Sequence, residues 1–345
     1  MLNKVSKWFL AGVNACIAVS HANRDNLTLR AVLNPNLIYV IPNSVDVNKF
    51  TPNPGLRYPL QTINIVSVNR LTLRKGVDLL VDVIPAILRK YPNVHFIIGG
   101  DGPKMNILKE MRDKYNIADK VELLGALPHH EVRNVLCRGH IFLNTSLTEA
   151  FCIAILEAAS CGLLCVSTNV GGIPEVLPPD MIYLAPARPM ALISQLEKAI
   201  GKINNIPVTK MHETVRSLYT WQNVADRTEK IYHTVLEAPK TNVLTKLKIL
   251  LSNGIISGPI TVIIYIMHIV LLLFCEWAYP DSSIERAINF DCHDYIDNPD
   301  KYGNHLYKVD EPSVNKRFEV VPEPDSNRPA SSRFELKRLN SKGEV

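Results

Sequence analysis

The sequence predicts an α/β protein with a doubly wound parallel sheet, followed by one membrane-spanning helix. Two observations predict the sheet. Short apolar runs rich in β-branched residues recur between residues 16 and 184, and segments of helical periodicity separate most of them. Strands joined by crossover helices pair in parallel and are covered on both faces. A third observation, an apolar run without charges over residues 255–275, predicts the span.

The individual elements follow from these patterns in chain order. The expected strands cover residues 16–20, 39–41, 63–68, 94–98, 121–124, 141–143, 163–167 and 181–184. The expected helices cover residues 23–33, 76–90, 104–115, 131–138, 150–160, 190–203, 211–220 and 221–238. A Pro- and Thr-containing connector over residues 50–61 separates the leading strand and helix from the larger unit.

Composition excludes several classes of protein. The chain has 345 residues, of which 47% are hydrophobic, so it is neither a wholly disordered protein nor a fibrous repeat. Its formal charge of +5 comes from 38 basic and 33 acidic residues spread along the sequence, which disfavours nucleic-acid binding. Seven cysteines without a CxxC pair argue against a zinc site or a disulfide framework and favour reduced thiols in a cytosolic body.

The first twenty residues resemble a signal peptide only superficially. Two lysines precede a short apolar stretch, but Asn14 interrupts that stretch and no small-residue cleavage pattern follows. We therefore expect this segment to be part of the folded protein.

The run IISGPITVIIYIMHIVLLLFC, residues 255–275, is long enough to cross about 30 Å of hydrocarbon at 1.5 Å per residue. A buried core helix is the alternative, although such helices rarely stay apolar all round. Lysines precede the run and acidic residues dominate the stretch after it, so the positive-inside tendency predicts a cytosolic body. Residues 276–345, rich in Pro, Asp and Asn, are expected to be largely disordered on the far side.

Chemistry is expected at the carboxyl ends of the strands, where ligands bind in such sheets. Arg70 follows the strand at residues 63–68, and Lys75 opens the next helix. Two cations beside a helix N-terminus suit a diphosphate, because the orphan N–H groups and the helix dipole add to their charge. The alternative is two solvated surface cations.

Glycine-rich turns follow two other expected strands. Residues 99–103 read GGDGP and residues 171–175 read GGIPE, and each fits either a close backbone approach to a ligand or a tight turn. Neither is GxGxxG, so a dinucleotide-binding dehydrogenase is disfavoured. Residues 41–46 could form a turn or an interdomain hinge, and His129 and His130 are expected on the first turn of a surface helix.

The block NTSLTEAFCIAILEAASCG places Glu149 and Glu157 in one expected helix, with Thr148 as its N-cap. On a helix these carboxylates lie about 12 Å apart along the axis, too far for an acid–base pair. They could instead contact two ends of an extended ligand, Glu149 a sugar hydroxyl and Glu157 a ribose, with phosphates at the helix N-terminus between them. A Glu in the first turn of a helix is also common without any function.

Together, the segments IPNSVD, NRLTLRKG, GGDGP, LLGALPHHEV, NTSLTEAF and VGGIPEV resemble the C-terminal nucleotide-sugar domain of retaining GT-B glycosyltransferases, over residues 38–234. Within that family the chain is most similar to the enzymes that begin GPI-anchor synthesis. The resemblance implies a remnant of an acceptor domain at residues 1–37, a Rossmann-like donor domain at 38–238, a transmembrane helix at 255–275 and a luminal tail at 276–345.

The resemblance implies transfer of N-acetylglucosamine from UDP-GlcNAc to phosphatidylinositol with retention of configuration. Arg70 and Lys75 would neutralise the departing diphosphate, Glu149 would bind sugar hydroxyls and Glu157 the uridine ribose. Backbone N–H groups near Phe151 and Cys152 would bind phosphate, so only the main chain of these two residues is implicated.

The resemblance further implies no cofactor and no metal, in keeping with the absence of a DxD sequence. It implies an endoplasmic reticulum membrane protein that works with other subunits of a GlcNAc-transferase complex. Two positions depart from the family pattern, because Cys152 and Ser44 stand where Gly is usual. A retaining enzyme with another acceptor, and a non-catalytic membrane assembly protein that binds UDP-sugar, remain the alternatives.

Overall fold

The computed structural model describes residues 2–57, 62–239, 241–280, 283, 318–322 and 334–338. The chain folds into two compact units, Met1–Val270 and Leu271–Val345. In the second unit, β9 (Phe318–Pro322) pairs antiparallel with β10 (Phe334–Arg338). The expectation of disorder over residues 276–345 falls mostly outside the described residues.

The first unit contains the predicted doubly wound sheet. Its strands are β3 (Ile63–Val68), β4 (Val94–Gly99), β5 (Val121–Gly125), β6 (Ile141–Asn144), β7 (Leu164–Thr168) and β8 (Ile182–Ala185). All pairs are parallel and the order is β5-β4-β3-β6-β7-β8. The chain therefore builds outward in one direction from β3 and then in the other from β6. This reversal leaves a crevice at the carboxyl ends of β3 and β6, where ligands of such sheets bind.

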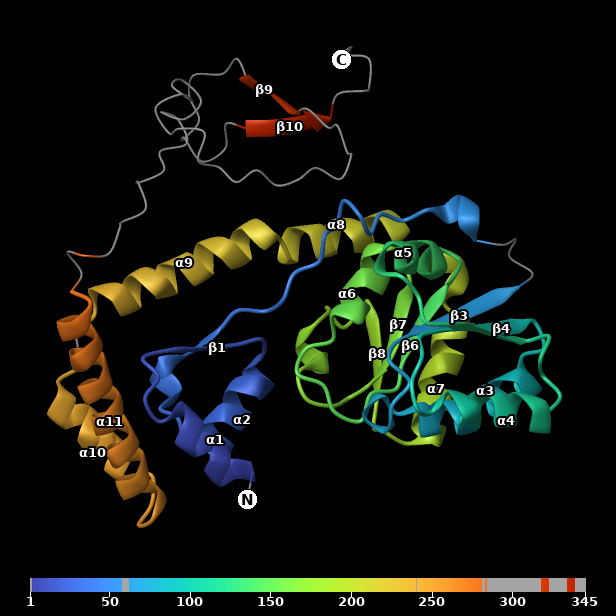
Figure 1. Cartoon of the computed structure of the whole chain (residues 1–345). Helices are drawn as coiled ribbons and strands as arrows, with labels where there is room; N and C mark the ends of the chain where they lie inside the picture. Colours follow the sequence, from blue (N-terminus) through green and yellow to red (C-terminus); the bar gives the residue numbers. More distant parts are fainter. Residues whose placement is uncertain are drawn as a thin grey trace, which may run out of the picture. The chain divides into compact units, whose positions relative to one another are not determined.

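Six helices cover the two faces of the sheet (Figure 1). They are α3 (Val77–Lys90), α4 (Met105–Lys114), α5 (His129–Cys137), α6 (Ile153–Ser160), α7 (Pro189–Ile200) and α8 (Val208–Leu218). One buried hydrophobic cluster joins α3, α4 and α7 to the sheet, and the other joins α5, α6 and α8 to it. Two apolar faces on a parallel sheet explain why its strands read as nearly continuous apolar runs.

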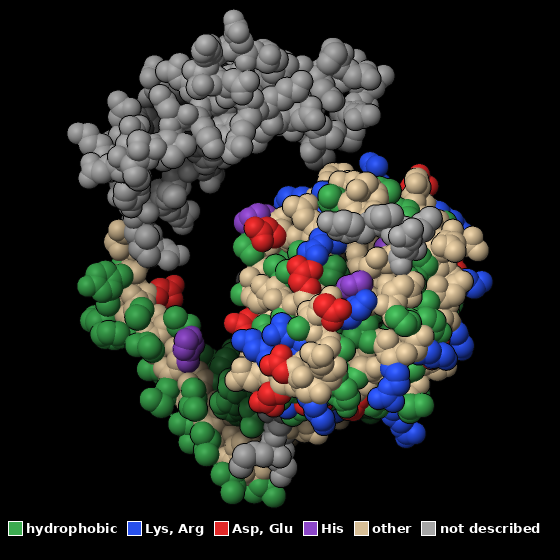
Figure 2. Space-filling model, turned by 90° about the vertical axis from the view of Figure 1, so that its right-hand side faces the viewer, with side chains coloured by type: hydrophobic (Ala, Val, Ile, Leu, Met, Phe, Trp, Pro, Cys, Tyr) green, Lys and Arg blue, Asp and Glu red, His purple; other side chains and the backbone are tan. Residues whose placement is uncertain are grey.

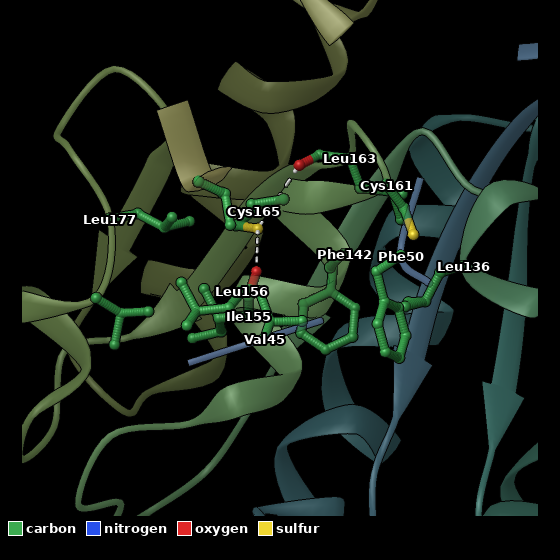
Figure 3. Packing of buried hydrophobic residues seen from close by; sticks show 14 of the residues in the cluster. Val45, Phe50, Leu136, Phe142, Ile155, Leu156, Cys161, Leu163, Cys165 and Leu177 are labelled. Carbon is green, nitrogen blue, oxygen red and sulfur yellow. Dashed lines mark hydrogen bonds between the residues drawn. The ribbon is translucent and has the colours of Figure 1, made fainter. Parts of the chain in front are cut away.

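The second cluster is shown in close-up in Figure 3. Phe142 of β6 packs near Ile155 of α6, and the Cys165 thiol lies 3.7 Å from the carbonyl oxygen of Ile155. Val45 and Phe50, from the segment before β3, belong to the same cluster. The connector is thus fastened to the helical face that carries α6.

A small leading sheet precedes this domain. It follows α1 (Leu2–Leu10) and consists of β1 (Cys16–Ala18) and β2 (Ile38–Val40), which pair in parallel around α2 (His21–Ala31). Ala18, Ala31, Leu33 and Ile38 form its core. Four buried residues are a small core, so this piece depends on contacts with the larger domain.

In the part of the chain that the structure describes, three helices follow the domain: α9 (Trp221–Glu237), α10 (Val243–Leu251) and α11 (Ser257–Ala278). Among the described residues, α11 is the one helix long and apolar enough to cross a membrane. Only 6% of its most apolar window is buried, which disfavours the alternative of a core helix. Hydrophobic side chains accordingly cover it in Figure 2. The sequence placed the span at residues 255–275, two residues earlier at the start than the helix begins.

Candidate functional site

The loops that follow β3 and β6 touch at the point where the sheet changes direction. Gly76 has a φ of +67°, and a Cβ there would lie 1.8 Å from the carbonyl oxygen of Thr145. Two hydrogen bonds join the same loops: the Thr145 hydroxyl donates to the Lys75 carbonyl at 2.9 Å, and the Leu147 N–H donates to the Arg74 carbonyl at 2.9 Å. The absence of a side chain at Gly76 is therefore what lets Lys75 reach the loop after β6.

Lys75 forms an ion pair with Glu149, a residue 74 positions later. Their side chains are 21% and 17% exposed, so solvent screens the pair only partly. The Ser146 hydroxyl lies 3.5 Å from Oε2 of Glu149, the oxygen that contacts Lys75. The Thr168 hydroxyl donates a hydrogen bond to the Ser146 carbonyl at 2.5 Å. Two charges that the sequence predicted at the starts of separate helices are thus held together in one place.

Cations also line a cavity of about 440 Å³ beside this pair. The cavity is lined by Arg70, Thr72, Arg74 and Lys75. Arg70 and Lys75 were the predicted diphosphate-binding cations, and the structure brings them together. Arg74 was missed, although it is the residue directly before Lys75. Three cations around a cavity at a helix start can bind and neutralise a diphosphate.

The glycine-rich turns approach protein backbone closely. A Cβ at Gly100 would lie 1.8 Å from the Asn69 carbonyl oxygen, so the loop after β4 supports the loop after β3. A Cβ at Gly171 would lie 1.9 Å from the Glu149 carbonyl oxygen, which also accepts the Gly172 N–H at 3.1 Å. The turn at residues 171–175 therefore lies against the backbone of Glu149 and helps to position it.

The expected helix around Glu149 was wrong at its start. Helix α6 begins at Ile153, and Cys152 before it has a φ of +77°, in the left-handed region. A helix cannot run through such a residue, so Thr148 does not cap α6 and Glu149 lies in the preceding loop. Glu149 and Glu157 are consequently not on one helix, so the expected separation of about 12 Å along a helix axis does not apply to them.

Phe151 could offer a ligand only its main chain. Its ring is 2% exposed and packs against the ring of Tyr219 with the centroids 5.8 Å apart. The first N–H groups of α6 have no carbonyl partner within the helix. The predicted phosphate contacts near Phe151 and Cys152 can therefore come only from backbone N–H groups.

Cys152 is buried at the start of α6, between Glu149 and Glu157 in the sequence. Burial, together with the negative charges of Glu149 and Glu157, raises the pKa of its thiol to about 12, although Lys75 acts to lower it. A thiol that senses all three charges lies among them. The predicted residues after β3 and after β6 thus meet, and Glu157 of α6 is near enough to Cys152 to act on its pKa.

Glu157 is 15% exposed, and burial raises the pKa of its carboxyl group. The opposing influence is His129 of α5, whose Nε2 lies 3.8 Å from the carboxylate. His129 does begin a surface helix, as the sequence predicted, but its proximity to Glu157 was missed. Within the described part of the chain, no group of three His, Cys, Asp or Glu side chains could hold a metal ion.

Known proteins resemble this chain in sequence and in fold. Residues 56–203 match the glycosyl transferases group 1 family. This chain carries a group 1 glycosyl transferase domain. Its homologues include a phosphatidylinositol N-acetylglucosaminyltransferase chain from Arabidopsis thaliana, 48% identical over 83% of this chain and 64% of the relative. The human protein of the same name is 48% identical over 84% of this chain and 60% of the relative. The chain thus spans about three-fifths of the length of these relatives.

Solved structures share the fold of the glycosyl transferase domain. Sucrose-phosphate synthase from Thermosynechococcus elongatus has a TM-score of 0.61 at 20% identity, over 69% of this chain and 62% of that one. HepE from Anabaena, solved in complex with UDP, has a TM-score of 0.57 at 19% identity, over 64% of each chain. These likenesses establish the GT-B fold.

The glycosyl transferase domain also holds the leading sheet through a residue that sequence reasoning missed. The Glu175 carboxylate accepts the backbone N–H groups of His21 at 2.7 Å and Ala22 at 2.9 Å, at the start of α2. Ser20, which caps this helix, donates its hydroxyl to the Ala150 carbonyl at 2.6 Å. A signal was present, because Ser20 before a helical segment predicts an N-cap. The leading piece therefore contacts the same loop that carries Glu149.

Proposed function

We propose that the chain binds UDP-GlcNAc and transfers N-acetylglucosamine to phosphatidylinositol, the first step of GPI-anchor synthesis, with the configuration of the sugar retained. The observation that carries this proposal is the ion pair between Lys75 and Glu149, which joins the loops after β3 and β6 at the carboxyl edge of the sheet. It occurs in a chain 48% identical to proteins named for phosphatidylinositol N-acetylglucosaminyltransferase.

The proposed chemistry follows from charge. Negative charge develops on UDP as the bond to the sugar breaks, and fixed cations lower the energy of that state. Arg70 and Lys75 supply this charge, and Arg74 on the same cavity adds to it. Backbone N–H groups at Phe151 and Cys152, just before α6, bind phosphate oxygens.

The two carboxylates orient the donor. Glu149 accepts hydrogen bonds from hydroxyls of the transferred sugar, and its pairing with Lys75 keeps it close to the diphosphate. Glu157 accepts from the hydroxyls of the uridine ribose. Positioning of both ends holds the anomeric carbon in one place relative to the acceptor. No cofactor takes part, and a metal is unnecessary because side chains neutralise the diphosphate.

The proposal also covers the organisation of the chain. Residues 1–37 belong to an acceptor domain, residues 38–238 bind the donor, and the span places the donor domain on the cytosolic face of the endoplasmic reticulum with residues 276–345 in the lumen. Phosphatidylinositol lies in that membrane, and a membrane anchor raises the chance of meeting it. The relatives are named as subunits of their transferase, which supports assembly with further chains.

The test uses microsomes from cells that lack the endogenous transferase. Each sample receives this chain, a variant or the full-length human relative as the positive control, and labelled N-acetylglucosamine is followed from UDP-GlcNAc into phosphatidylinositol. We expect product from the chain, none from Lys75→Met, and unchanged product after addition of a chelator. Lys90→Met is the matched control, because Lys90 is also ion-paired, with Glu197, but lies on α3 outside the site.

Three results would contradict the proposal in different ways. Equal product from Lys75→Met and Lys90→Met would remove Lys75 from the reaction. Loss of product on chelation would overturn the metal-independent mechanism. Binding of UDP-GlcNAc without product, where the human relative gives product, would favour a non-catalytic donor-binding role.

A further inference from the structure

Helix α10, just before the span, has an apolar side that no other described element covers fully. At 100° per residue, five apolar residues fall within a sector of about 120°. They are Val243, Leu244, Leu247, Leu250 and Leu251. Leu244 is 66% exposed and Leu251 50% exposed. Lys246 and Lys248 flank the sector on its two sides, so the helix is amphipathic with basic margins.

Helix α1 shows a second set of exposed apolar side chains near the same place. Phe9 is 70% exposed and Val5 is 42% exposed. The Trp8 indole N–H donates a hydrogen bond to the Thr261 hydroxyl on α11. This hydrogen bond joins residues 253 positions apart in the sequence and brings α1 into contact with the first turns of the predicted span.

A groove separates α1 from the turn between α10 and α11. Its volume is about 830 Å³, and its lining includes Val5, Lys7, Trp8, Ile256 and Ile260. Helices α10 and α11 meet closely at the same turn, because a Cβ at Gly258 would lie 2.3 Å from the Leu251 carbonyl oxygen. We name this groove, together with the exposed apolar side chains of α1 and α10 on either side of the turn, the juxtamembrane surface.

The sequence distance to the span places this surface near the membrane. Helix α10 ends at Leu251 and α11 begins at Ser257. Even a fully extended connection of this length reaches only about 20 Å. Helices that lie in the headgroup layer carry an apolar face with Lys at its margins and aromatic residues at the interface. Together, α1 and α10 supply these features.

We propose that the juxtamembrane surface lies in the headgroup layer of the bilayer, with the apolar side chains of α1 and α10 among the upper acyl chains and their lysines at lipid phosphates. The occupant is a phospholipid surface containing anionic lipid. Contact with it would hold the body at the membrane in addition to the span, because Lys7, Lys246 and Lys248 complement anionic headgroups. The proposal rests on α11 crossing the membrane and goes beyond the proposed transfer reaction.

The chain has three tryptophans, which allow a direct test. Full-length single-tryptophan variants, with the other two replaced by Phe, are reconstituted into vesicles of phosphatidylcholine and phosphatidylserine. Brominated acyl chains quench tryptophans in lipid, and acrylamide quenches those in water. Trp8 reports the juxtamembrane surface, Trp277 at the end of α11 reports the span, and Trp221 at the start of α9 reports the body.

We expect brominated lipid to quench Trp8 and Trp277, and acrylamide to quench Trp221. In the Trp8-only chain, Leu244→Glu combined with Leu251→Glu should reduce lipid quenching by about half, because charged side chains withdraw α10 from the apolar layer. Met190→Glu is the matched control, since Met190 on α7 is 76% exposed and lies outside this surface. It should leave the quenching of Trp8 unchanged.

Two results would overturn the proposal while leaving the span in place. In both, lipid quenches Trp277. If acrylamide quenches Trp8 as strongly as Trp221, the surface faces water. If neither reagent quenches Trp8, protein covers the surface, either a second copy or another chain of a complex. Failure of lipid to quench Trp277 would instead refute the span itself. Transfer activity is not part of this readout, so the reaction can fail or succeed independently.

Discussion

Replacement of Gly76 by Ala tests whether contact between the loops after β3 and β6 builds the site. Gly76 has a left-handed φ of +67°, and the added Cβ would overlap the Thr145 carbonyl oxygen at 1.8 Å. Backbone on both sides makes this overlap hard to relieve. The loops must move apart, and Lys75 would then leave Glu149.

The expected destabilisation has two parts. A left-handed conformation costs Ala about 1–2 kcal/mol. Separation of the loops breaks the hydrogen bonds from Thr145 to Lys75 and from Leu147 to Arg74. Each such bond contributes about 1 kcal/mol, so the free energy of unfolding should fall by about 3–4 kcal/mol in total.

Gly125→Ala is the matched control. Gly125 also has a left-handed φ, +72°, but a Cβ there has nothing within 4 Å. This variant should lose only the conformational part. The remaining difference of about 2 kcal/mol corresponds to a thermal midpoint about 4–8 °C lower for Gly76→Ala than for Gly125→Ala in a domain of this size.

Thermal unfolding of the detergent-solubilised chain, followed by tryptophan fluorescence, measures the midpoints, and titration calorimetry measures UDP affinity. Gly76→Ala should lose UDP binding because Lys75 is displaced, and Gly125→Ala should keep it. Equal midpoints for the two variants would refute the argument from close approach. Undiminished UDP affinity in Gly76→Ala would refute the link between the loop contact and the site.

Three further predictions concern single residues. Burial raises the pKa of Glu157, so the folded protein keeps this proton at a higher pH than the unfolded chain, and stability should fall as the pH rises through the raised pKa. Glu157→Gln should abolish that step in the thermal midpoint against pH; an unchanged step would assign it elsewhere. The Glu175 carboxylate accepts hydrogen bonds from the backbone N–H groups of His21 at 2.7 Å and Ala22 at 2.9 Å. Glu175→Ala should therefore lower the protection of these two amides against hydrogen exchange by about 1 kcal/mol. Unaltered exchange there would show that Glu175 does not hold the helix. Cys152→Gly should unfold at a higher temperature than Cys152→Ala, because Ala retains a left-handed strain of about 1–2 kcal/mol at a φ of +77°. A higher unfolding temperature for Cys152→Ala than for Cys152→Gly would contradict the argument that the backbone is strained at residue 152.

The local pattern of apolar residues in the sequence was sufficient to predict most of the helices and strands. The strand expected at residues 63–68 is β3, and the helix expected at residues 221–238 differs from α9 by one residue. Apolar periodicity reports which residues are buried, and burial in strands and helices has different periods. The doubly wound parallel class was predicted for the same reason, because strands alternated with helices.

Local pattern failed at the start of α6. The sequence predicted a helix from residue 150, yet Cys152 is left-handed and α6 begins at Ile153. Contacts from distant segments hold the loop before it: Ser20 bonds the Ala150 carbonyl, and Gly172 bonds the Glu149 carbonyl. Such contacts outweigh a helix propensity of about a few tenths of a kcal/mol per residue.

The sequence alone therefore determined the α/β class, the apolar span and the residue types suited to a diphosphate donor. Only the tertiary structure decided which of them meet. Lys75 and Glu149 are 74 positions apart, and Glu175 and His21 are 154 apart. Their contacts depend on the order of strands in the sheet and on glycines that admit close backbone approach. Periodicity carries no information on strand order, because a strand has the same apolar pattern beside any neighbour.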